Sequence, residues 1–252
     1  MRDVDFVFHL AAMKRVDACE ENPLEAVETN IIGSSNIRSA AIKNNVKKVI
    51  FTSSDKAISP TNTYGATKLI AERLLAAPSS SATTFVSVRF GNVMGSRGSV
   101  IPLFQEQIKT NQLITITDPE MTRFMMTLSQ ATSLTLQALK ESKGGEVFVL
   151  KMPVIRLGDL ADLLIQQSGL SISTELIGLK PGEKMYEELM TYDESQHAWE
   201  LDDMFVIPSD SKSLYSDSKK VKRGTYRSND QEVVTKHQLH QLLLEAGLLD
   251  KR

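Results

Sequence analysis

The chain has very little cysteine, no long apolar run and no glycine-rich turn near its start. Cys19 is its one cysteine, so an internal disulfide is impossible and a cysteine-based metal cluster is excluded. A reducing, cytoplasmic location is therefore expected. No apolar stretch approaches the roughly 18 residues that a membrane helix needs. Residues 1–12 do not follow the order of a signal peptide.

The chain also has no excess of charge of one sign. Among 252 residues, 29 are Lys or Arg and 31 are Asp or Glu, for a net charge of -2. This balance gives no general affinity for nucleic acid or for an anionic membrane. The apolar fraction of 41% and charged fraction of 24% are ordinary for a globular protein. His9, His197, His237 and His240 lack metal-ligand spacing with carboxylates, so they are interpreted as structural or surface residues and no metal site is predicted.

The periodicity of apolar residues predicts alternating strands and helices over the first 155 residues. Strands are predicted at residues 4–10, 47–53, 84–90 and 146–150, and helices at residues 23–43, 64–76, 101–110 and 128–140. Strand, helix, strand order indicates parallel strands joined by right-handed crossovers. Further on, helices at 157–167, 185–190 and 237–244, a strand at 176–179 and a loop at 209–218 are predicted.

These elements predict an α/β protein with two parts. Residues 1–155 would form a Rossmann-like parallel-sheet domain with substrate-loop insertions near residues 92–127, and residues 156–252 a smaller α+β C-terminal substrate lobe. Such a domain normally opens with a strand, a G-x-G-x-x-G turn and a helix whose N-terminus takes the pyrophosphate. The glycine cluster at residues 91–98 has the wrong spacing and comes too late. Either the chain is a fragment that lacks the first strands and this turn, or it does not bind a dinucleotide.

Polar side chains follow three of the predicted strands, at residues 9–12, 53–56 and 89–92. In an open parallel sheet, ligands bind just beyond the carboxyl ends of the strands. The active-site candidates are therefore expected among these residues.

The pair Tyr64 and Lys68 is the strongest local signal. Residues four apart share a helix face, so the Lys68 ammonium is expected to approach the Tyr64 phenol. A nearby cation lowers a tyrosine pKa from about 10 towards neutrality. Tyr64 could then take a proton from a sugar hydroxyl while hydride leaves the same carbon. A buried tyrosine beside an exposed lysine is the simpler alternative, because this spacing is common by chance.

Asp55 and Lys56 form a second acid–base pair. Asp55 lies nine residues before Tyr64. Such a pair in a loop is usually solvated. Directly beyond a buried strand, burial and a second cation would instead lower the lysine pKa from about 10.4. A neutral Lys56 could remove a carbon-bound proton made acidic by a neighbouring ketone.

At these motifs the chain resembles a known family. The runs FHLAAMKRVDACEENPLEAVETNIIGSSN, SSDKAISPTNTYGATKLIAE, VRFGNVMGSRGSVIPLF and TITDPEMTRFMM are similar to the extended short-chain dehydrogenase/reductase superfamily. Within it, the resemblance is to the polysaccharide-biosynthesis branch of UDP-N-acetylglucosamine 4,6-dehydratases, some of which invert C5. The later runs IGLKPGEKMYEELMTYDE and GTYRSNDQEVVTKHQLHQLL are similar to the C-terminal region of that branch. The resemblance implies that roughly 70 to 80 residues of a normal member, with the glycine-rich turn, are absent.

The resemblance implies the catalytic roles. Tyr64 and Lys68 would handle hydride transfer between the sugar C4 and the nicotinamide of NAD or NADP, and Ser54 would hydrogen-bond the C4 oxygen. Lys56 would take the C5 proton, and Asp55 would protonate the departing C6 hydroxyl. The product would be a 4-keto-6-deoxy sugar nucleotide. Because this chain keeps Tyr64, where some C5-inverting members have methionine, inversion at C5 stays open.

The resemblance also implies binding residues. Ala11 and Ala12 would pack against the cofactor. Asn30 is also predicted among the cofactor-binding residues, where it would brace the active-site backbone. Lys14, Asn92 and the loop to Ser99 would meet the UDP-sugar. Arg123 would clamp phosphate, because its guanidinium offers a fork of donors, and Glu183 would accept bonds from ribose hydroxyls. Members of this branch usually have arginine at the position of Lys180, so the lysine puts a nucleotide contact at this position in doubt.

Two alternatives stay open at this stage. A UDP-sugar 4-epimerase needs the Tyr64–Lys68 pair but no C5 base, so the Asp55–Lys56 pair argues against it. A catalytically incompetent fragment is the other, because a chain without the glycine-rich turn is expected to bind NAD(P) poorly. The exposed edge of such a sheet would favour aggregation. The resemblance further suggests a homo-oligomer.

Overall fold

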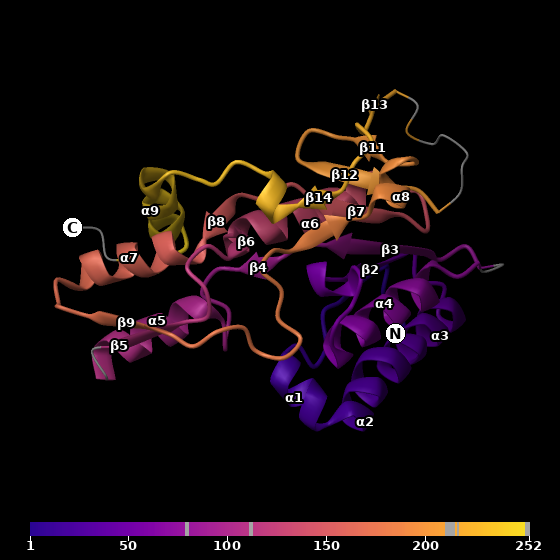
Figure 1. Ribbon diagram of the computed structural model, residues 1–252. Helices are drawn as coiled ribbons and strands as arrows, with labels where there is room; N and C mark the ends of the chain where they lie inside the picture. Colours follow the sequence, from indigo (N-terminus) through magenta and orange to yellow (C-terminus); the bar gives the residue numbers. More distant parts are fainter. Residues whose placement is uncertain (79–80, 111–112, 210–214, 216, 250–252) are drawn as a thin grey trace. The chain divides into compact units, whose positions relative to one another are not determined.

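The computed structural model describes residues 1–78, 81–110, 113–209, 215 and 217–249 (Figure 1). They divide into two units with interleaved segments. Unit 1 comprises Met1–Phe90, Ser133–Lys151 and Glu188–Tyr226, and unit 2 comprises Gly91–Thr132, Met152–Glu187 and Arg227–Arg252. Because the chain passes repeatedly from one unit to the other, the division differs from the boundary expected at residue 155.

The sheet of unit 1 contains the strands expected from the apolar runs. Its order is β1-β2-β3-β7-β12-β11-β13. The first four strands are parallel, and β12 joins β7 in antiparallel register. Their bounds are β1 Phe6–His9, β2 Lys48–Thr52, β3 Thr84–Arg89, β7 Val147–Leu150, β11 Trp199–Glu200, β12 Met204–Ile207 and β13 Lys219–Lys220. Successive residues are buried along β2, β3 and β7, as in a sheet covered on both faces. The predicted α/β class is confirmed.

Strand β1 stands at one end of this order, next to β2. Phe6 and Phe8 on it are 48% and 39% exposed. The aggregation expected from an exposed edge stays a prediction.

Helices α1 to α4 of unit 1 lie on one side of strands β2 and β3, and α8 lies on the other side (Figure 1). Their bounds are α1 Val16–Glu21, α2 Pro23–Ala26, the π-helix η1 Val27–Ile32, α3 Gly33–Lys43, the 3-10 turn η2 Asp55–Ala57, α4 Thr63–Ala76 and α8 Tyr192–Ser195. The helix predicted at residues 23–43 is thus interrupted by a π-turn, a feature that is frequent near functional sites. Helix α6, Leu128–Glu141, crosses the division between the units.

A buried ion-pair network joins the end of β3 to α4 and α8 within unit 1. Arg89, 1% exposed, donates to both carboxylate oxygens of Glu72 at 2.9 and 2.5 Å and to those of Glu194 at 2.9 and 2.8 Å. Burial opposes the charge of Glu194, but the bonds from Arg89 and from Thr191 hold its pKa below the usual value. Glu194 also completes the capping box of α8 with Thr191. One buried cation thereby connects three segments of the chain.

Unit 2 has its own apolar core. Its strands are β4 Asn92–Val93, β5 Leu113–Ile116, β6 Thr122–Met126, β8 Val154–Arg156 and β9 Ser173–Leu176, and its helices α5 Val100–Thr110, α7 Leu157–Ser168, the 3-10 turn η3 Ser228–Asp230 and α9 Lys236–Glu245. Strands β4, β6 and β8 form one small sheet, and β5 pairs with β9 in parallel. Residues such as Phe104, Leu160 and Leu243 are buried between these helices and strands.

Several short elements differ from the predictions. Residues 185–190, predicted as a helix, contain the strand β10 Glu188–Met190, which pairs with β14 Tyr226–Arg227. The strand predicted at 176–179 lies earlier, as β9. Short strands such as β6 and β12 were not predicted, because they are paired with segments far along the chain rather than marked by a local repeat. Residues 210–214 and 216 of the predicted loop at 209–218 lie outside the described residues.

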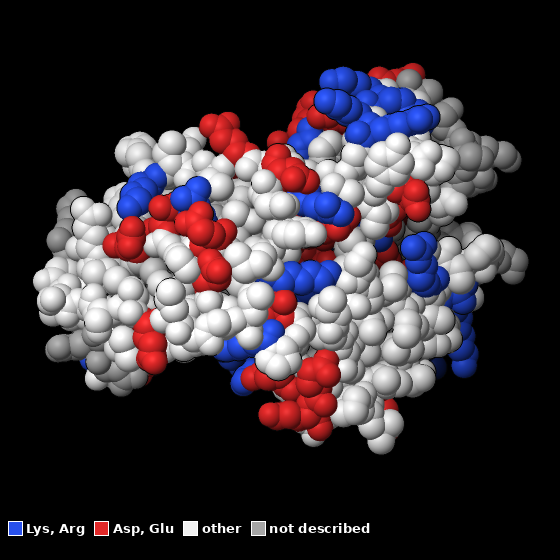
Figure 2. Space-filling view, viewed as in Figure 1, with Lys and Arg blue, Asp and Glu red and all other residues white. Residues whose placement is uncertain are grey.

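The surface carries both signs of charge, interspersed over most of the face shown in Figure 2. One basic group stands out near β13, where Lys219, Lys220, Lys222 and Arg223 are exposed. Among the described residues, no helix is both long enough and apolar enough to cross a membrane.

The Arg89 network predicts a large loss of stability when its cation is removed. Arg89→Met leaves the Glu72 carboxylate buried without its partner, and we expect a loss of about 3–5 kcal/mol in unfolding free energy. Urea unfolding of the wild type and the variant measures this. The exposed Arg2→Met is the control and is expected to stay within about 0.5 kcal/mol. A loss below about 1 kcal/mol for Arg89→Met would show that the network is dispensable.

Candidate active site

The acid–base residues lie where β2 ends, as predicted. The Ser53 amide still bonds the Val88 carbonyl at 2.7 Å, and the Asp55 amide bonds the Phe90 carbonyl at 3.3 Å. These bonds continue the contact with β3 beyond the last residue of β2. The chain then turns into η2, where the Ser54 hydroxyl caps the Lys56 amide at 3.2 Å. The strand end and the turn together place Ser54, Asp55 and Lys56 side by side.

Asp55 is a buried carboxylate with two close partners. It is 5% exposed, and Ser54 Oγ donates to its Oδ1 at 2.9 Å. Lys56 Nζ donates to Oδ1 at 3.2 Å and to Oδ2 at 2.9 Å. The Lys56 side chain is 31% exposed, whereas the Asp55 side chain is 4% exposed. A carboxylate removed from water needs such partners, so the pair is held in place rather than solvated.

Tyr64 reaches the same group from α4. Asn62 caps this helix through the Gly65 amide at 2.8 Å. A side chain at Gly65 would overlap the Lys56 carbonyl oxygen, so glycine permits the close approach of α4 to η2. Tyr64 is 9% exposed, and its phenol lies close enough to Ser54 and Lys56 to interact with both. Lys56, Asp55, Ser54 and Tyr64 therefore form one connected set of polar groups, called here the Tyr64 cluster.

The pKa of Tyr64 differs from the prediction. Burial raises it, and the positive charge of Lys56 and the interaction with Ser54 oppose that rise. The sequence predicted that Lys68 would lower this pKa towards neutrality. Lys56 is instead the cation that acts on Tyr64, because the strand end brings it to the phenol.

Lys68 is bonded to the sheet. Its Nζ donates to the Thr52 carbonyl at 2.5 Å and lies 4.0 Å from the centroid of the Phe51 ring. Lys68 is 3% exposed. Burial lowers its pKa to about 8, and the charge of Glu72 opposes this shift. Lys68 shares a helix with Tyr64 as predicted, but its ammonium is anchored to β2.

The loop after β1 is braced by Asn30. The Met13 amide donates to Asn30 Oδ1 at 2.8 Å, and Asn30 Nδ2 donates to the Met13 carbonyl at 3.0 Å and to Thr67 Oγ1 at 2.9 Å. Asn30 is 1% exposed. The bracing role expected for Asn30 agrees with these bonds. A direct cofactor contact of Asn30 stays a prediction.

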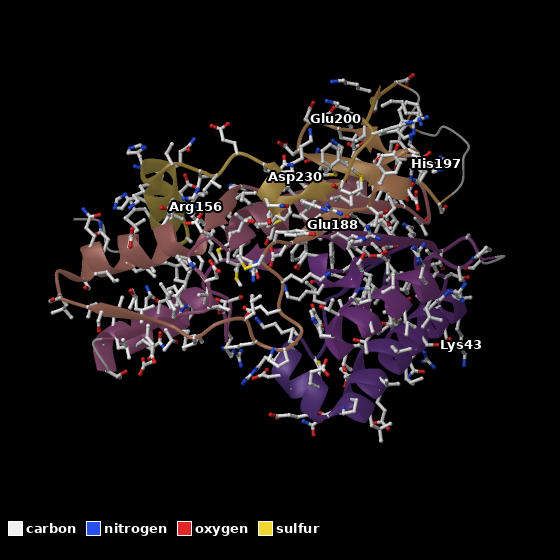
Figure 3. All side chains as sticks on the ribbon, viewed as in Figure 1. Lys43, Arg156, Glu188, His197, Glu200 and Asp230 are labelled. Atoms are coloured by element: carbon white, nitrogen blue, oxygen red, sulfur yellow. The ribbon has the colours of Figure 1, made fainter. Side chains whose placement is uncertain are left out.

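The other residues of this loop are nearer the surface. Ala11 and Lys14 are exposed and Ala12 is half-buried, and their cofactor and substrate contacts stay predictions. His9 is buried, and its Nε2 lies 2.9 Å from Ser34 Oγ. Burial lowers the pKa of His9, and the charge of Lys68 adds to this. His197, between α8 and β11, and His237 are exposed and His240 is half-buried (Figure 3 labels His197). These positions agree with structural and surface roles.

Unit 2 contains most of the residues predicted to bind substrate, and Glu187 joins two of them. Asn92 Nδ2 donates to the Glu187 carboxylate at 2.9 and 3.0 Å, and Arg123 Nε lies 3.5 Å from it. Arg123 also donates to the carbonyls of Thr122 and Lys184, both at 2.9 Å. Its guanidinium is thus directed at protein groups, and the phosphate contact stays a prediction.

Glu183 and Ser99 have different surroundings. Glu183 accepts from the Lys180 amide at 3.1 Å and lies 3.7 Å from Arg123. Lys180 is exposed. The Ser99 hydroxyl is buried and has no hydrogen-bond partner among the described residues. Their substrate contacts remain predictions.

Sequence reasoning missed Glu187 and the Arg89 network. Glu187 is 6% exposed and lies in the short run MYEELM, where nothing local distinguishes it from its neighbour Glu188. Arg89 had a signal, because it ends an otherwise apolar strand, and a charged residue there needs a buried partner.

The order of the parallel strands, the crossover helices and the Tyr64–Lys68 pair on α4 define a Rossmann-like protein of the extended short-chain dehydrogenase/reductase class. A family model described as "Polysaccharide biosynthesis protein" matches residues 1–209. The chain belongs to this family.

Its relatives are longer than this chain. It is 42% identical to "Uncharacterized membrane protein MJ1061" of Methanocaldococcus jannaschii, over 99% of this chain and 77% of the relative. It is 44% identical to a "UDP-glucose 4-epimerase" of Rickettsia canadensis, over 85% of this chain and 64% of the relative. The solved structure "X-ray structure of Pen from Bacillus thuringiensis" has a TM-score of 0.93 and 61% identity, over 99% of this chain and 78% of that one.

Lys68 gives a prediction for stability against pH. Its folded pKa of about 8 is below the ordinary 10.5, so the unfolded chain binds more protons between these values. Stability therefore rises with pH through this window. The unfolding free energy of the wild type relative to that of Lys68→Met is expected to rise by about 2 kcal/mol between about pH 7.5 and about pH 10. Urea unfolding at both pH values measures it.

The matched control is Lys43→Met. Lys43 is exposed in the last turn of α3 (Figure 3), so its difference from the wild type is expected to stay constant with pH. A constant difference for Lys68→Met as well would contradict the lowered pKa.

Proposed function

We propose that this chain carries the acid–base groups of an NAD(P)-dependent enzyme that converts a UDP-N-acetylhexosamine into a 4-keto-6-deoxy sugar nucleotide for surface polysaccharide biosynthesis. The observation that supports this most is the Tyr64 cluster, in which Asp55 pairs with Lys56 and bonds Ser54, and the Tyr64 phenol interacts with Ser54 and Lys56. A dehydratase needs a base for C5 and an acid for the C6 hydroxyl beside its C4 base. The cluster contains all three kinds of group.

The residues beyond β1 and β2 suit the nicotinamide end of NAD(P). Ala11 is exposed and Ala12 half-buried, so their backbone is open to close approach. The Ser53 hydroxyl is buried at the end of β2, without a partner among the described residues. In this proposal Ala11, Ala12 and Ser53 hold that end. NAD(P) held there would supply a hydride acceptor for C4 and a hydride donor for C6.

Tyr64 takes the proton of the C4 hydroxyl in the first step. The Tyr64 phenol interacts with Ser54, so the Ser54 hydroxyl can hydrogen-bond the C4 oxygen with little movement. Because burial raises the pKa of Tyr64, the phenolate needs a compensating cation. Lys56 supplies that charge in the described structure.

Asp55 and Lys56 then act together in the elimination. A proton passes from Lys56 Nζ to Asp55 Oδ2 along their 2.9 Å contact, which makes Lys56 a neutral base and Asp55 a neutral acid. Lys56 removes the C5 proton, and Asp55 gives its proton to the departing C6 hydroxyl, which leaves as water. Lys56 and Asp55 are then both charged, as at the start. When hydride adds to C6, Lys56 returns a solvent-exchanged proton to C5, and the proton that Tyr64 took from the C4 hydroxyl balances this loss.

A UDP-sugar 4-epimerase is the second candidate. The 44% identical Rickettsia canadensis relative carries that name, and epimerisation needs Tyr64 and Lys68 but no acid–base pair for C5 and C6. The buried, ion-paired Asp55 favours the dehydratase, because an enzyme that acts at C4 alone has no use for this pair.

An incompetent fragment is the third candidate. The chain spans 64% to 77% of the first relatives that it matches, so the activity of the whole protein is a proposal for this chain. Binding of NAD by the 252-residue chain, measured by calorimetry, separates this candidate from the others.

The product of UDP-N-acetylglucosamine tests the proposal. With NAD or NADP in deuterated water, we expect a product that has lost the mass of one water and gained deuterium at C5, detected by mass spectrometry and NMR. Lys56→Met and Asp55→Asn are expected to slow its formation by about 10²–10⁴-fold, because each loses one proton-transfer group. Lys43→Met, remote from the cluster on α3, is the control.

Two results would refute the dehydratase. One is a 4-epimer without loss of water or deuterium at C5, which identifies the epimerase. The other is full dehydration by Lys56→Met, which removes the proposed base from the reaction.

A further inference from the structure

Asn92 is held against β6 in unit 2 by close backbone packing. It follows Gly91, where a side chain would approach Phe124 Cβ and the Phe124 carbonyl oxygen to 2.8 Å and Glu187 Oε2 to 3.3 Å. The Gly91 amide meets Met152 Sδ at 3.1 Å. Glycine at position 91 thereby lets β4 lie directly against Phe124. This packing fixes the backbone from which the Asn92 side chain extends.

The orientation of the Asn92 carboxamide follows from its partners. Nδ2 donates to Glu187 Oε1 at 2.9 Å, to Glu187 Oε2 at 3.0 Å and to the Phe124 carbonyl at 3.1 Å. All three partners are acceptors, so the nitrogen and not the oxygen must face them. Both amide hydrogens are used there. Asn92 Oδ1 has no hydrogen-bond partner in the part of the chain that the structure describes, and Asn92 is half-buried.

Glu187 is itself held from several sides. Its Oε2 accepts the Phe124 amide at 3.0 Å, and Arg123 Nε lies 3.5 Å from Oε1. Its backbone amide donates to Ser228 Oγ at 2.9 Å, and its carbonyl accepts the Ser228 amide at 2.9 Å. A buried carboxylate with this many partners has a fixed direction, so it can fix the direction of another side chain.

We propose that Glu187 is a positioning residue that turns Asn92 so that its carboxamide oxygen is the group offered to the sugar nucleotide. This rests on the proposed function, in which Asn92 contacts that substrate. An oxygen acceptor pairs with a hydroxyl or N–H donor and is repelled by the oxygens of a charged diphosphate. Asn92 therefore recognises a hydroxyl or N–H donor of the sugar rather than the diphosphate.

Binding of two probes tests the inference. Calorimetry measures the dissociation constants of UDP and UDP-N-acetylglucosamine for the wild type, Glu187→Gln, Asn92→Ala and the double variant. Glu187→Gln replaces one acceptor oxygen by a donor nitrogen, which disturbs the carboxamide. We expect about tenfold weaker binding of UDP-N-acetylglucosamine, as for the loss of one hydrogen bond, and UDP binding within about twofold. Asn92→Ala is expected to do the same, and the double variant to add nothing further.

The control is Glu175→Gln, which removes the same charge from an exposed position on β9 and is expected to leave both constants unchanged. Equal weakening of UDP and UDP-N-acetylglucosamine by Asn92→Ala would overturn the inference, because Asn92 would then serve the diphosphate. Additive effects in the double variant would also overturn it, because Glu187 would then act without Asn92.

A readout without ligand separates this inference from the proposed function. In ¹⁵N-labelled protein, the Asn92 side-chain amide, identified by its loss in Asn92→Ala, is expected to exchange slowly in the wild type and fast in Glu187→Gln. If the wild type binds neither probe, the proposed function fails. Slow exchange would then support the positioning by Glu187 alone, and fast exchange in the wild type would overturn it.

Discussion

The buried carboxylate of Asp55 constrains the whole candidate site. A charge that is 5% exposed at the end of an apolar strand is costly unless it is bonded on several sides. Ser54 and Lys56 provide those bonds, and both also interact with the Tyr64 phenol. In the proposed reaction, these neighbouring groups would supply an acid, a base and a phenol to one substrate.

The packing of α4 makes this arrangement possible. Glycine at position 65 lets the helix meet the η2 turn at backbone distance, which brings the Tyr64 phenol to Ser54. Lys68 on the same helix is bonded to the Thr52 carbonyl. The helix is thus attached to β2 by Lys68 and to β3 through Glu72 and Arg89. The two charged contacts hold the face of α4 that carries Tyr64 against the sheet.

Local patterns predicted the parts of the protein that local physics determines. The apolar runs of β2 and β3 and the polar residues at the end of β2 were placed correctly, because burial and strand ends are visible in short stretches of sequence. The i and i+4 spacing placed Lys68 on the helix face of Tyr64 but could not show that its ammonium turns to Thr52. The bonds from Asn92 to Glu187 and from Arg89 to Glu194 join residues 95 and 105 positions apart. A local sequence pattern does not identify partners that are so far apart in the chain. The sequence therefore predicted a role for Asn92 but not its partner Glu187, and it predicted no role for Arg89.

The most direct test of the central coupling is the pKa of Tyr64 itself. Incorporation of 3,5-difluorotyrosine at position 64 brings the phenol titration into an accessible range, and ¹⁹F NMR follows it in the wild type, Lys56→Met and Lys68→Met. The account predicts that Lys56→Met raises this pKa, because the cation that acts on the phenol is lost. Lys68→Met is expected to leave it nearly unchanged. A rise in Lys68→Met with no change in Lys56→Met would contradict the account.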